Sequence, residues 1–151
     1  IGEPLGATTN ALFREAVSAG IATSLDASSV GALAAWGPEE SRRRFGETGA
    51  SHLFANEEEV AYLDLIERPI PNMTLIVKRG AGLAEVRDPH GRQIATLPAP
   101  PLSGAIDSTG AGDAFAGGFA VARAGGAAWE DALRAGHRAA SAHLMEQQKR
   151  G

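Results

Sequence analysis

Short apolar segments alternate with amphipathic ones along the first half of this chain, and this alternation constrains the fold more than any other feature. The run Leu75-Ile76-Val77 is apolar at every position, which is typical of a strand covered on both faces. A helix between successive strands implies right-handed crossovers and parallel pairing. We therefore expect an α/β fold of three layers, with a mainly parallel central sheet and flanking helices. The expected strands cover 21–25, 52–55 and 74–78, and the expected helices 8–19, 38–45 and 56–66. Thr8, Thr9 or Asn10 is expected to cap the first helix and Gly20 to end it. In the second helix, Glu39/Arg43 and Glu40/Arg44 are spaced as i,i+4 ion pairs.

The second half has a different pattern. Strands predicted over 83–87 and 92–97 flank Asp88-Pro89-His90-Gly91, a sequence typical of a tight turn, so we expect a β-hairpin. Two helices are predicted after it, over 109–124 and 129–147, with Gly125-Gly126 ending the first. No internal repeat or linker divides the sequence, so a single domain is expected.

Composition and charge exclude several functional classes. The chain has no cysteine, which excludes disulfides, thiolate metal sites and a cysteine nucleophile. A net charge of −4 argues against a nucleic-acid binder that relies on phosphate contacts. The apolar runs are far shorter than the roughly 20 residues that span a bilayer, and the first residues do not resemble a signal peptide. We expect a cytoplasmic protein that binds neither membrane nor nucleic acid.

The stretch Asp107–Gly118 carries the clearest chemical signal, and reads DSTGAGDAFAGG. Gly110 and Gly112 flank the start of a predicted helix, where backbone N–H groups and the helix dipole together favour an anion. Asp113 falls in the first turn, close to any anion held there. A carboxylate beside a phosphate is suited to act as a general base during phosphoryl transfer.

Other glycine-loop and hydrolytic motifs are absent from the sequence. No Gly-Lys pair is present, so there is no Walker loop, and neither Gly110-x-Gly112 nor Gly80-x-Gly82 is followed by the third glycine of a dinucleotide fingerprint. Neither H-E-x-x-H nor G-x-S-x-G occurs. His137 and His143 are six residues apart, which places them on different helix faces, and we interpret them as surface or core residues.

Residues 107–118 resemble the second signature of the PfkB carbohydrate kinases, the ribokinase-like family, whose pattern centres on D-S/T-T-G-A-G-D-x-F. The resemblance implies ATP-dependent phosphorylation of a hydroxyl of a sugar or nucleoside. It implies that Asp113 is the base and that the backbone of Gly110, Ala111 and Gly112 forms the anion hole. Asp107 matches a position that in many members helps to hold a monovalent cation such as K⁺, beside the Thr109 backbone.

Two further segments fall where the family would place functional residues. Asn56 and Glu59 match an N-x-x-E element linked to Mg²⁺ through water, although the same spacing predicts a helix capping box, and both roles are compatible. Lys78, Gly80 and Gly82 follow a strand, as the family's nucleotide-phosphate loop does. The alternative to phosphate binding is that Lys78 is a solvated lysine and that Gly80 and Gly82 form a plain turn between strands.

The resemblance extends from about residue 23 to 144 and covers only the C-terminal half of a family member. It implies the nucleotide-binding and catalytic portion of one ribokinase-like domain over residues 1–151, without the N-terminal half and its lid, and it leaves open whether this chain alone is active. The rival hypotheses are a truncated, non-catalytic nucleotide-binding or pairing module, and an α/β binding protein with a chance motif. An unpaired edge strand would favour association, with a homodimer as the expected assembly.

Overall fold

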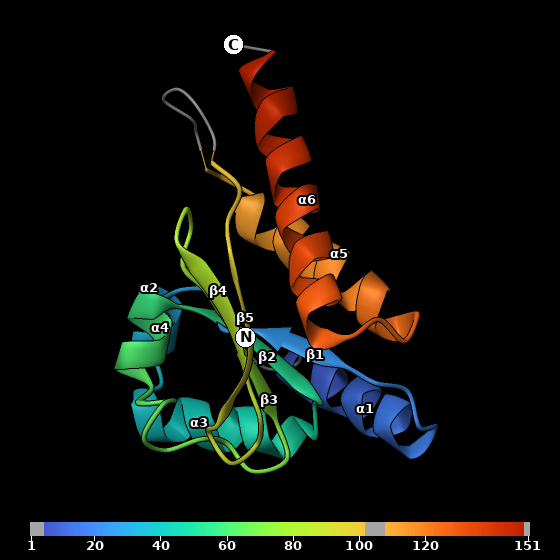
Figure 1. Cartoon of the computed structure of the whole chain (residues 1–151). Coiled ribbons are helices and arrows are strands. Elements are labelled where there is room, and N and C mark those ends of the chain that lie inside the picture. The colour runs from blue at the N-terminus through green and yellow to red at the C-terminus, as the bar shows by residue number, and fades with distance from the viewer. Residues whose placement is uncertain (1–4, 102–107, 150–151) are drawn as a thin grey trace. The chain divides into compact units, whose positions relative to one another are not determined.

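We describe residues 5–101 and 108–149 in a computed structural model of the chain (Figure 1). Neighbouring strands of the five-stranded sheet follow the order β1-β2-β3-β4-β5. The described elements are α1 (Leu5–Ser18), β1 (Ser24–Asp26), α2 (Val30–Ala34), α3 (Pro38–Thr48), β2 (His52–Asn56), α4 (Glu57–Tyr62), β3 (Thr74–Lys78), β4 (Leu83–Arg87), β5 (Gln93–Pro98), α5 (Ala111–Ala124) and α6 (Trp129–Gln148).

The described residues fall into two compact units. The first unit contains residues up to 77 together with 87–92, and the second contains 78–86 and the residues from 93 onward. In the first unit β1 pairs with β2 in parallel, as predicted, with Leu25 opposite Leu53. Helix α2 contacts both α3 and α4. The core of this unit consists of buried apolar side chains: Ala27, Leu33, Phe45, Ala50, Leu53, Ala55, Val60, Leu63, Leu65, Ile70, Met73, Leu75 and Val77.

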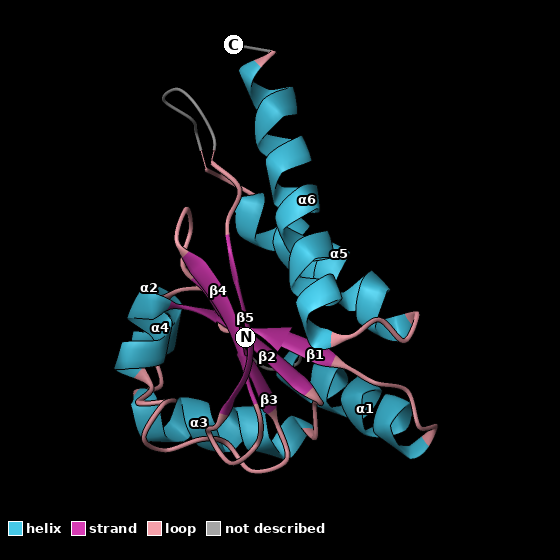
Figure 2. Cartoon of the chain, in the orientation of Figure 1, coloured by secondary structure: helices cyan, strands magenta, loops and turns pink. Residues whose placement is uncertain are grey.

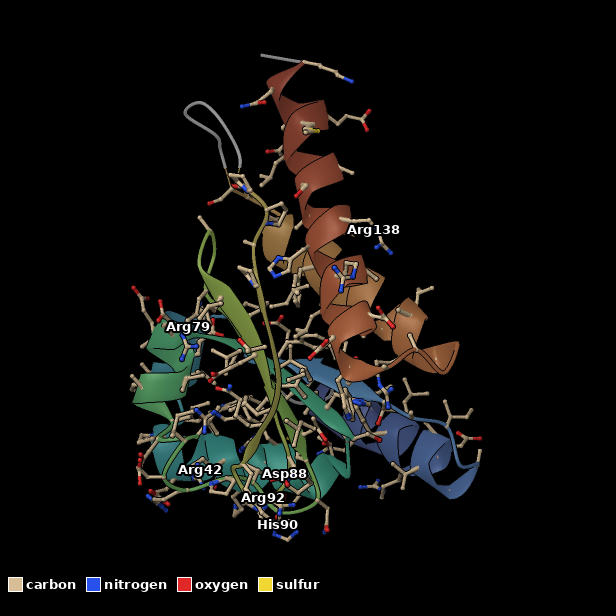
Figure 3. The ribbon with its side chains drawn as sticks, in the orientation of Figure 1. Arg42, Arg79, Asp88, His90, Arg92 and Arg138 are labelled. Carbon is tan, nitrogen blue, oxygen red and sulfur yellow. The ribbon has the colours of Figure 1, made fainter. Side chains whose placement is uncertain are left out.

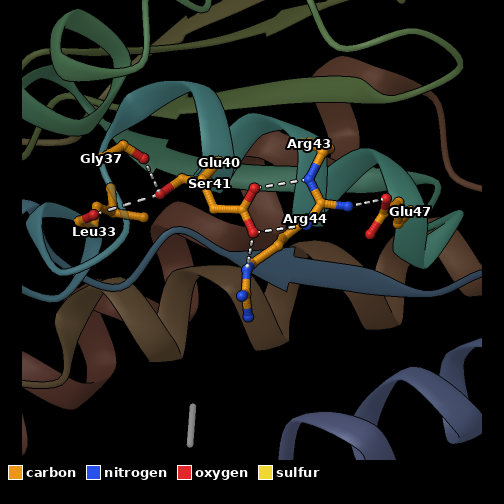
Figure 4. Close-up of polar contacts among 7 residues, drawn as sticks. All are labelled: Leu33, Gly37, Glu40, Ser41, Arg43, Arg44 and Glu47. Carbon is orange, nitrogen blue, oxygen red and sulfur yellow. Dashed lines mark hydrogen bonds and ion pairs between the residues drawn. The ribbon is translucent and has the colours of Figure 1, made fainter.

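Helix α3 begins at Pro38 as predicted but extends to Thr48, beyond the predicted residue 45, and one of its two predicted ion pairs is replaced by another. Pro38 occupies the first helical turn. Glu40 accepts hydrogen bonds from Arg43 and Arg44, and these arginines hold the pKa of its carboxyl down at about 2 (Figure 4). The predicted pair of Glu39 with Arg43 is wrong, because Glu39 instead lies 2.6 Å from Arg68, 29 positions along the chain.

Helix α4 ends earlier than the predicted residue 66. Asp64 has a left-handed backbone (φ 52°), and the Leu65 N–H donates to the Val60 carbonyl at 3.0 Å, which closes the helix in a Schellman arrangement. Glycine is the usual residue at such a position, so an aspartate there gave no stop signal. Leu65 is then buried just after the helix instead of continuing it.

The N-terminal elements differ from prediction in three ways. Helix α1 begins at Leu5, so the expected caps Thr8, Thr9 and Asn10 lie inside it. Strand β1 begins at Ser24, because Ile21 still donates its N–H to the end of α1. The five-residue helix α2 was not predicted, and it is capped by the Ser29 hydroxyl, which accepts from the Ala32 N–H.

The hairpin between β4 and β5 forms as predicted. The Asp88 carboxylate accepts from the backbone N–H of His90 at 2.9 Å and of Arg92 at 3.0 Å, so the turn is held by its first residue (Figure 3). The Arg92 side chain also pairs with Asp88, which keeps the pKa of the aspartate below its usual value against the opposing effect of burial.

Helices α5 and α6 of the second unit pack against each other, and α6 also contacts β5 (Figure 2). A Cβ on Gly118 would lie 2.8 Å from the Ala135 carbonyl oxygen, so the absence of a side chain here permits the close packing of α5 on α6. A Cβ on Gly117 would meet nothing within 4 Å. Over the ranges 5–101 and 108–149, no helix is long and apolar enough to cross a membrane.

Candidate active site

The glycine loop of residues 108–112 includes the N-terminus of α5, which begins at Ala111. Gly110 is the N-cap and has a left-handed backbone (φ 79°), which side-chain-bearing residues rarely adopt. The N–H of Ala111 donates to the Ser108 carbonyl, and the N–H of Ala114 donates to the Gly110 carbonyl. The N–H groups of Gly112 and Asp113 have no backbone acceptor among the residues described. The start of this 14-residue helix therefore offers donors to an anion.

Asp113 is the third residue of α5, and its side chain is exposed. Within the described ranges its carboxylate makes no hydrogen bond or ion pair. Burial of Phe115, two residues later, fixes the orientation of the first turn. The carboxylate is therefore accessible to a hydroxyl group that approaches the N-terminus of the helix.

Lys78 and Gly112 lie next to each other, although 34 residues separate them in sequence. The Nζ atom of Lys78, at the end of β3, lies 3.4 Å from where a Cβ on Gly112 would be. A lysine ammonium and the positive end of a helix dipole thus converge on one point. This arrangement favours a phosphate or another anion there, and a Cβ at position 112 would be in contact with the Lys78 ammonium.

Gly80 and Gly82 belong to the turn that joins Lys78 to β4. The Gly82 N–H donates to the Arg79 carbonyl at 2.8 Å, and the Gly82 carbonyl accepts from Ala99. Arg79, labelled in Figure 3, pairs with the buried Glu85 at 3.2 Å. The sequence did not predict this ion pair, which anchors the turn to the strand that follows.

The carbonyl of Thr109 is held by α6. It accepts a hydrogen bond from Nε2 of His143 at 2.9 Å and from the side-chain amide of Gln147 at 3.1 Å. His143 was predicted to be a plain surface or core residue, and nothing in the sequence linked it to the loop. Asp107, the expected ligand of a monovalent cation, lies outside the described residues.

Asn56 and Glu59 form the predicted capping box at the start of α4, in the first unit. The Asn56 side chain accepts from the Glu59 N–H at 2.9 Å, and the Glu59 carboxylate accepts from the backbone and side-chain N–H groups of Asn56, both at 2.8 Å. Glu59 is 1% exposed. Its role as a cap is confirmed, and its expected role toward Mg²⁺ stays a prediction. Among the described residues, no group of three or more His, Asp or Glu side chains could hold a metal ion.

His137 is a core residue of the second unit. Its ring makes an edge contact with Phe115, and its Nε2 donates to the Leu97 carbonyl at 3.3 Å. Burial lowers the pKa of His137 below its ordinary value, and the hydrogen bond to Leu97 opposes this only in part. His137 therefore serves packing in the neutral state.

Comparisons with known proteins agree with the sequence resemblance. The pfkB family carbohydrate kinase domain matches residues 39–149. A comparison with curated protein sequences finds no match.

Among solved structures, adenosine kinase from Schistosoma mansoni, in complex with adenosine and AMP, is similar in fold with a TM-score of 0.74 and 19% identity, over 93% of this chain and 46% of that one. Burkholderia thailandensis nucleoside kinase, in complex with inosine, matches with a TM-score of 0.69 and 25% identity. The match covers 88% of this chain and 45% of that one. The nucleoside kinase of Methanocaldococcus jannaschii, an archaeal member of the ribokinase family, matches with a TM-score of 0.61 and 25% identity. The match covers 80% of this chain and 40% of that one. The chain therefore has a ribokinase-like fold and spans less than half the length of these proteins.

Proposed function

Because the chain belongs to the pfkB family of carbohydrate kinases, we propose that it carries the nucleotide-binding and catalytic portion of an enzyme that phosphorylates a hydroxyl of a sugar or nucleoside with ATP. The proposed region is the C-terminal part of a single ribokinase-like domain, and the acceptor-binding residues lie mostly outside it. A reaction that consumes ATP is expected in the cytoplasm.

One observation carries the proposal. At the start of α5, backbone donors that have no acceptor among the described residues, the nearby ammonium of Lys78 and the exposed carboxylate of Asp113 occur together within the second unit. Donors and a cation bind an anion, but a carboxylate beside a bound anion is unfavourable unless it accepts a proton there. Phosphoryl transfer to a hydroxyl needs such a base next to phosphate.

The proposed reaction assigns a role to each of these groups. Asp113 accepts the proton of the acceptor hydroxyl as its oxygen bonds to the γ-phosphorus of ATP, and the bond to the β,γ-bridging oxygen breaks to release ADP. The N–H groups of Gly112 and Asp113, with the backbone of Gly110 and Ala111, stabilise the charge of the transferred group. Lys78, Gly80, Gly82 and Thr109 are proposed to contact the phosphates of the nucleotide.

Mg²⁺ is the expected companion of ATP, and it would supply neutralisation of the phosphate charge. The carboxylate of Glu59 and the side-chain amide of Asn56 supply oxygen atoms of the kind that bind Mg²⁺-coordinated water, and the capping box fixes the Glu59 carboxylate through both of its oxygens. The donor set therefore fits a water-mediated role for Asn56 and Glu59. Within the capping box these two residues hold each other in place whether or not the ion is bound.

The proposal is tested by incubating the full-length protein with ATP, MgCl₂ and a panel of sugars and nucleosides, and by detecting the phosphorylated acceptor by mass spectrometry. We expect one acceptor class to be phosphorylated with equal formation of ADP. Nucleotide binding by the protein without transfer to any acceptor would instead favour the alternative of a non-catalytic nucleotide-binding module.

A further inference from the structure

The Thr109 carbonyl lies at an unusual junction between the glycine loop and the last helix. Two side chains of α6, one turn apart, both direct nitrogen atoms at this one oxygen: Nε2 of His143 at 2.9 Å and Nε2 of Gln147 at 3.1 Å. The two nitrogen atoms are 3.0 Å from each other. A carbonyl oxygen has two lone pairs, so two donors saturate it.

The protonation state of His143 follows from this geometry. The amide nitrogen of Gln147 has only donor hydrogens, and it can share the Thr109 oxygen with His143 only if the histidine also donates. Nε2 of His143 therefore carries a hydrogen. The close approach of the two nitrogen atoms results from their common acceptor.

Two further observations show that the contact constrains the loop. The Oε1 atom of Gln147 is buried with no hydrogen-bond partner in the described part of the chain, so the amide makes its described contacts through its nitrogen alone. A Cβ on Gly110 would lie 2.8 Å from Nε2 of His143. The imidazole therefore contacts the loop at the residue whose left-handed backbone begins α5.

We propose that His143 and Gln147 are positioning residues, which fix the Gly110–Gly112 loop by occupying both lone pairs of the Thr109 carbonyl. This role rests on the proposed function in one respect, because there the loop is proposed to hold the transferred phosphoryl group. The donors act on the carbonyl that precedes Gly110. They set the direction of the Gly112 and Asp113 N–H groups without contacting the substrate themselves.

The same contacts disagree with a monovalent cation at this carbonyl. The resemblance of Asp107 to a cation-binding position would place K⁺ beside the Thr109 backbone. A cation needs the lone pairs of the oxygen that two N–H groups already use, and those groups direct their positive ends at the same point. In this chain, side chains of α6 therefore replace the cation at Thr109, and we expect activity that is independent of K⁺.

The first test is spectroscopic and needs no kinase activity. The ¹⁵N NMR spectrum of the labelled protein is recorded at a pH where imidazole is neutral. The ring signals of His143 are assigned by their loss in His143→Phe. We expect the Nε2–H tautomer, and we expect His143→Phe to shift the backbone amide signals of Gly110 and Gly112. His90→Phe is the matched control, because His90 lies in the exposed β4–β5 turn and should leave those amide signals unchanged.

The second test compares kinetic constants in the full-length protein. His143→Phe keeps a planar ring but removes the donor, so kcat should fall about 10- to 100-fold with a much smaller change in the KM of the acceptor. His143→Gln places an amide donor at similar reach and should restore most of kcat. The rate should be equal in KCl and in tetramethylammonium chloride.

The outcomes separate this proposal from the proposed function. The Nδ1–H tautomer, unchanged Gly110 and Gly112 amide signals in His143→Phe, or stimulation by K⁺ would overturn the positioning role. If no acceptor is phosphorylated, the proposed function fails, and the tautomer and the amide shifts still decide whether His143 and Gln147 fix the loop.

Discussion

A Cβ atom on Gly118 would lie 2.7 Å from the Cβ of Ala139, so α5 and α6 approach each other more closely than a side chain at position 118 permits. Gly118→Ala must push the helices apart or distort one of them. We expect the free energy of unfolding to fall by about 1–3 kcal/mol, measured by urea denaturation.

Gly117 provides the matched control because it is the neighbouring glycine in the same helix. A Cβ there meets nothing within 4 Å, and alanine is the better helix former. Gly117→Ala should raise the free energy of unfolding by up to about 1 kcal/mol. Equal effects at positions 117 and 118 would contradict the packing of α5 on α6.

The capping box of α4 predicts a loss of stability when it is broken. Asn56→Ala removes the acceptor of the Glu59 N–H and the side-chain amide donor to the buried Glu59 carboxylate, while the backbone N–H of residue 56 remains, and should lower the free energy of unfolding by about 0.5–2 kcal/mol. Thermal and urea unfolding measure the change. Glu58→Gln is the control, because this exposed glutamate lies in the same turn outside the box.

The metal role of the same residues is tested separately, by titrating MgCl₂ against turnover in Glu59→Gln and Glu58→Gln. A shift in the Mg²⁺ concentration for half-maximal rate in Glu59→Gln alone supports the water-mediated role. An unchanged Mg²⁺ dependence with lowered stability would leave the capping box as the whole role of Glu59.

His137 predicts how stability depends on pH. Its folded-state pKa lies below the ordinary value of 6.5 because burial disfavours the charged ring. The unfolded chain therefore binds the proton first. Stability is fully present above about pH 6.5 and falls as the pH drops from there toward the lower folded-state pKa.

Urea denaturation between pH 5 and 8 measures this dependence. His137→Gln should flatten the part of the curve below about pH 6.5, whereas His90→Gln, in an exposed turn, should leave it unchanged. If the free energy of unfolding of His137→Gln falls with decreasing pH as steeply as that of the wild type, the pH dependence belongs to other groups.

Local patterns predicted the regular elements well. The apolar run Leu75-Ile76-Val77 is a buried strand, and glycines at positions 20 and 126 end helices with left-handed backbones, as expected. The prediction failed where an ordinary residue adopts an unusual conformation, as Asp64 does at the end of α4, and where an element is as short as α2. Such features depend on tertiary packing rather than on propensity.

The sequence indicated the individual residues of the candidate site, but not which of them lie next to each other. The family resemblance indicated the loop of residues 107–113 and Lys78, yet only the folded chain brings Lys78 against Gly112. The contact of His143 with Thr109 spans 34 positions and carries no motif. Likewise Glu39 was expected to pair within its own helix and instead reaches Arg68. Pairings between distant elements cannot be read from local spacing.

The central claim, that Asp113 is the general base of a kinase, is tested most directly by Asp113→Asn in the full-length protein. The matched control is Asp131→Asn, since Asp131 is the third residue of α6 as Asp113 is of α5, and is also exposed. We predict that kcat falls about 10²- to 10⁴-fold in Asp113→Asn while the Kd of ATP changes little, and that Asp131→Asn behaves as wild type. Turnover in Asp113→Asn at the wild-type rate would contradict the claim.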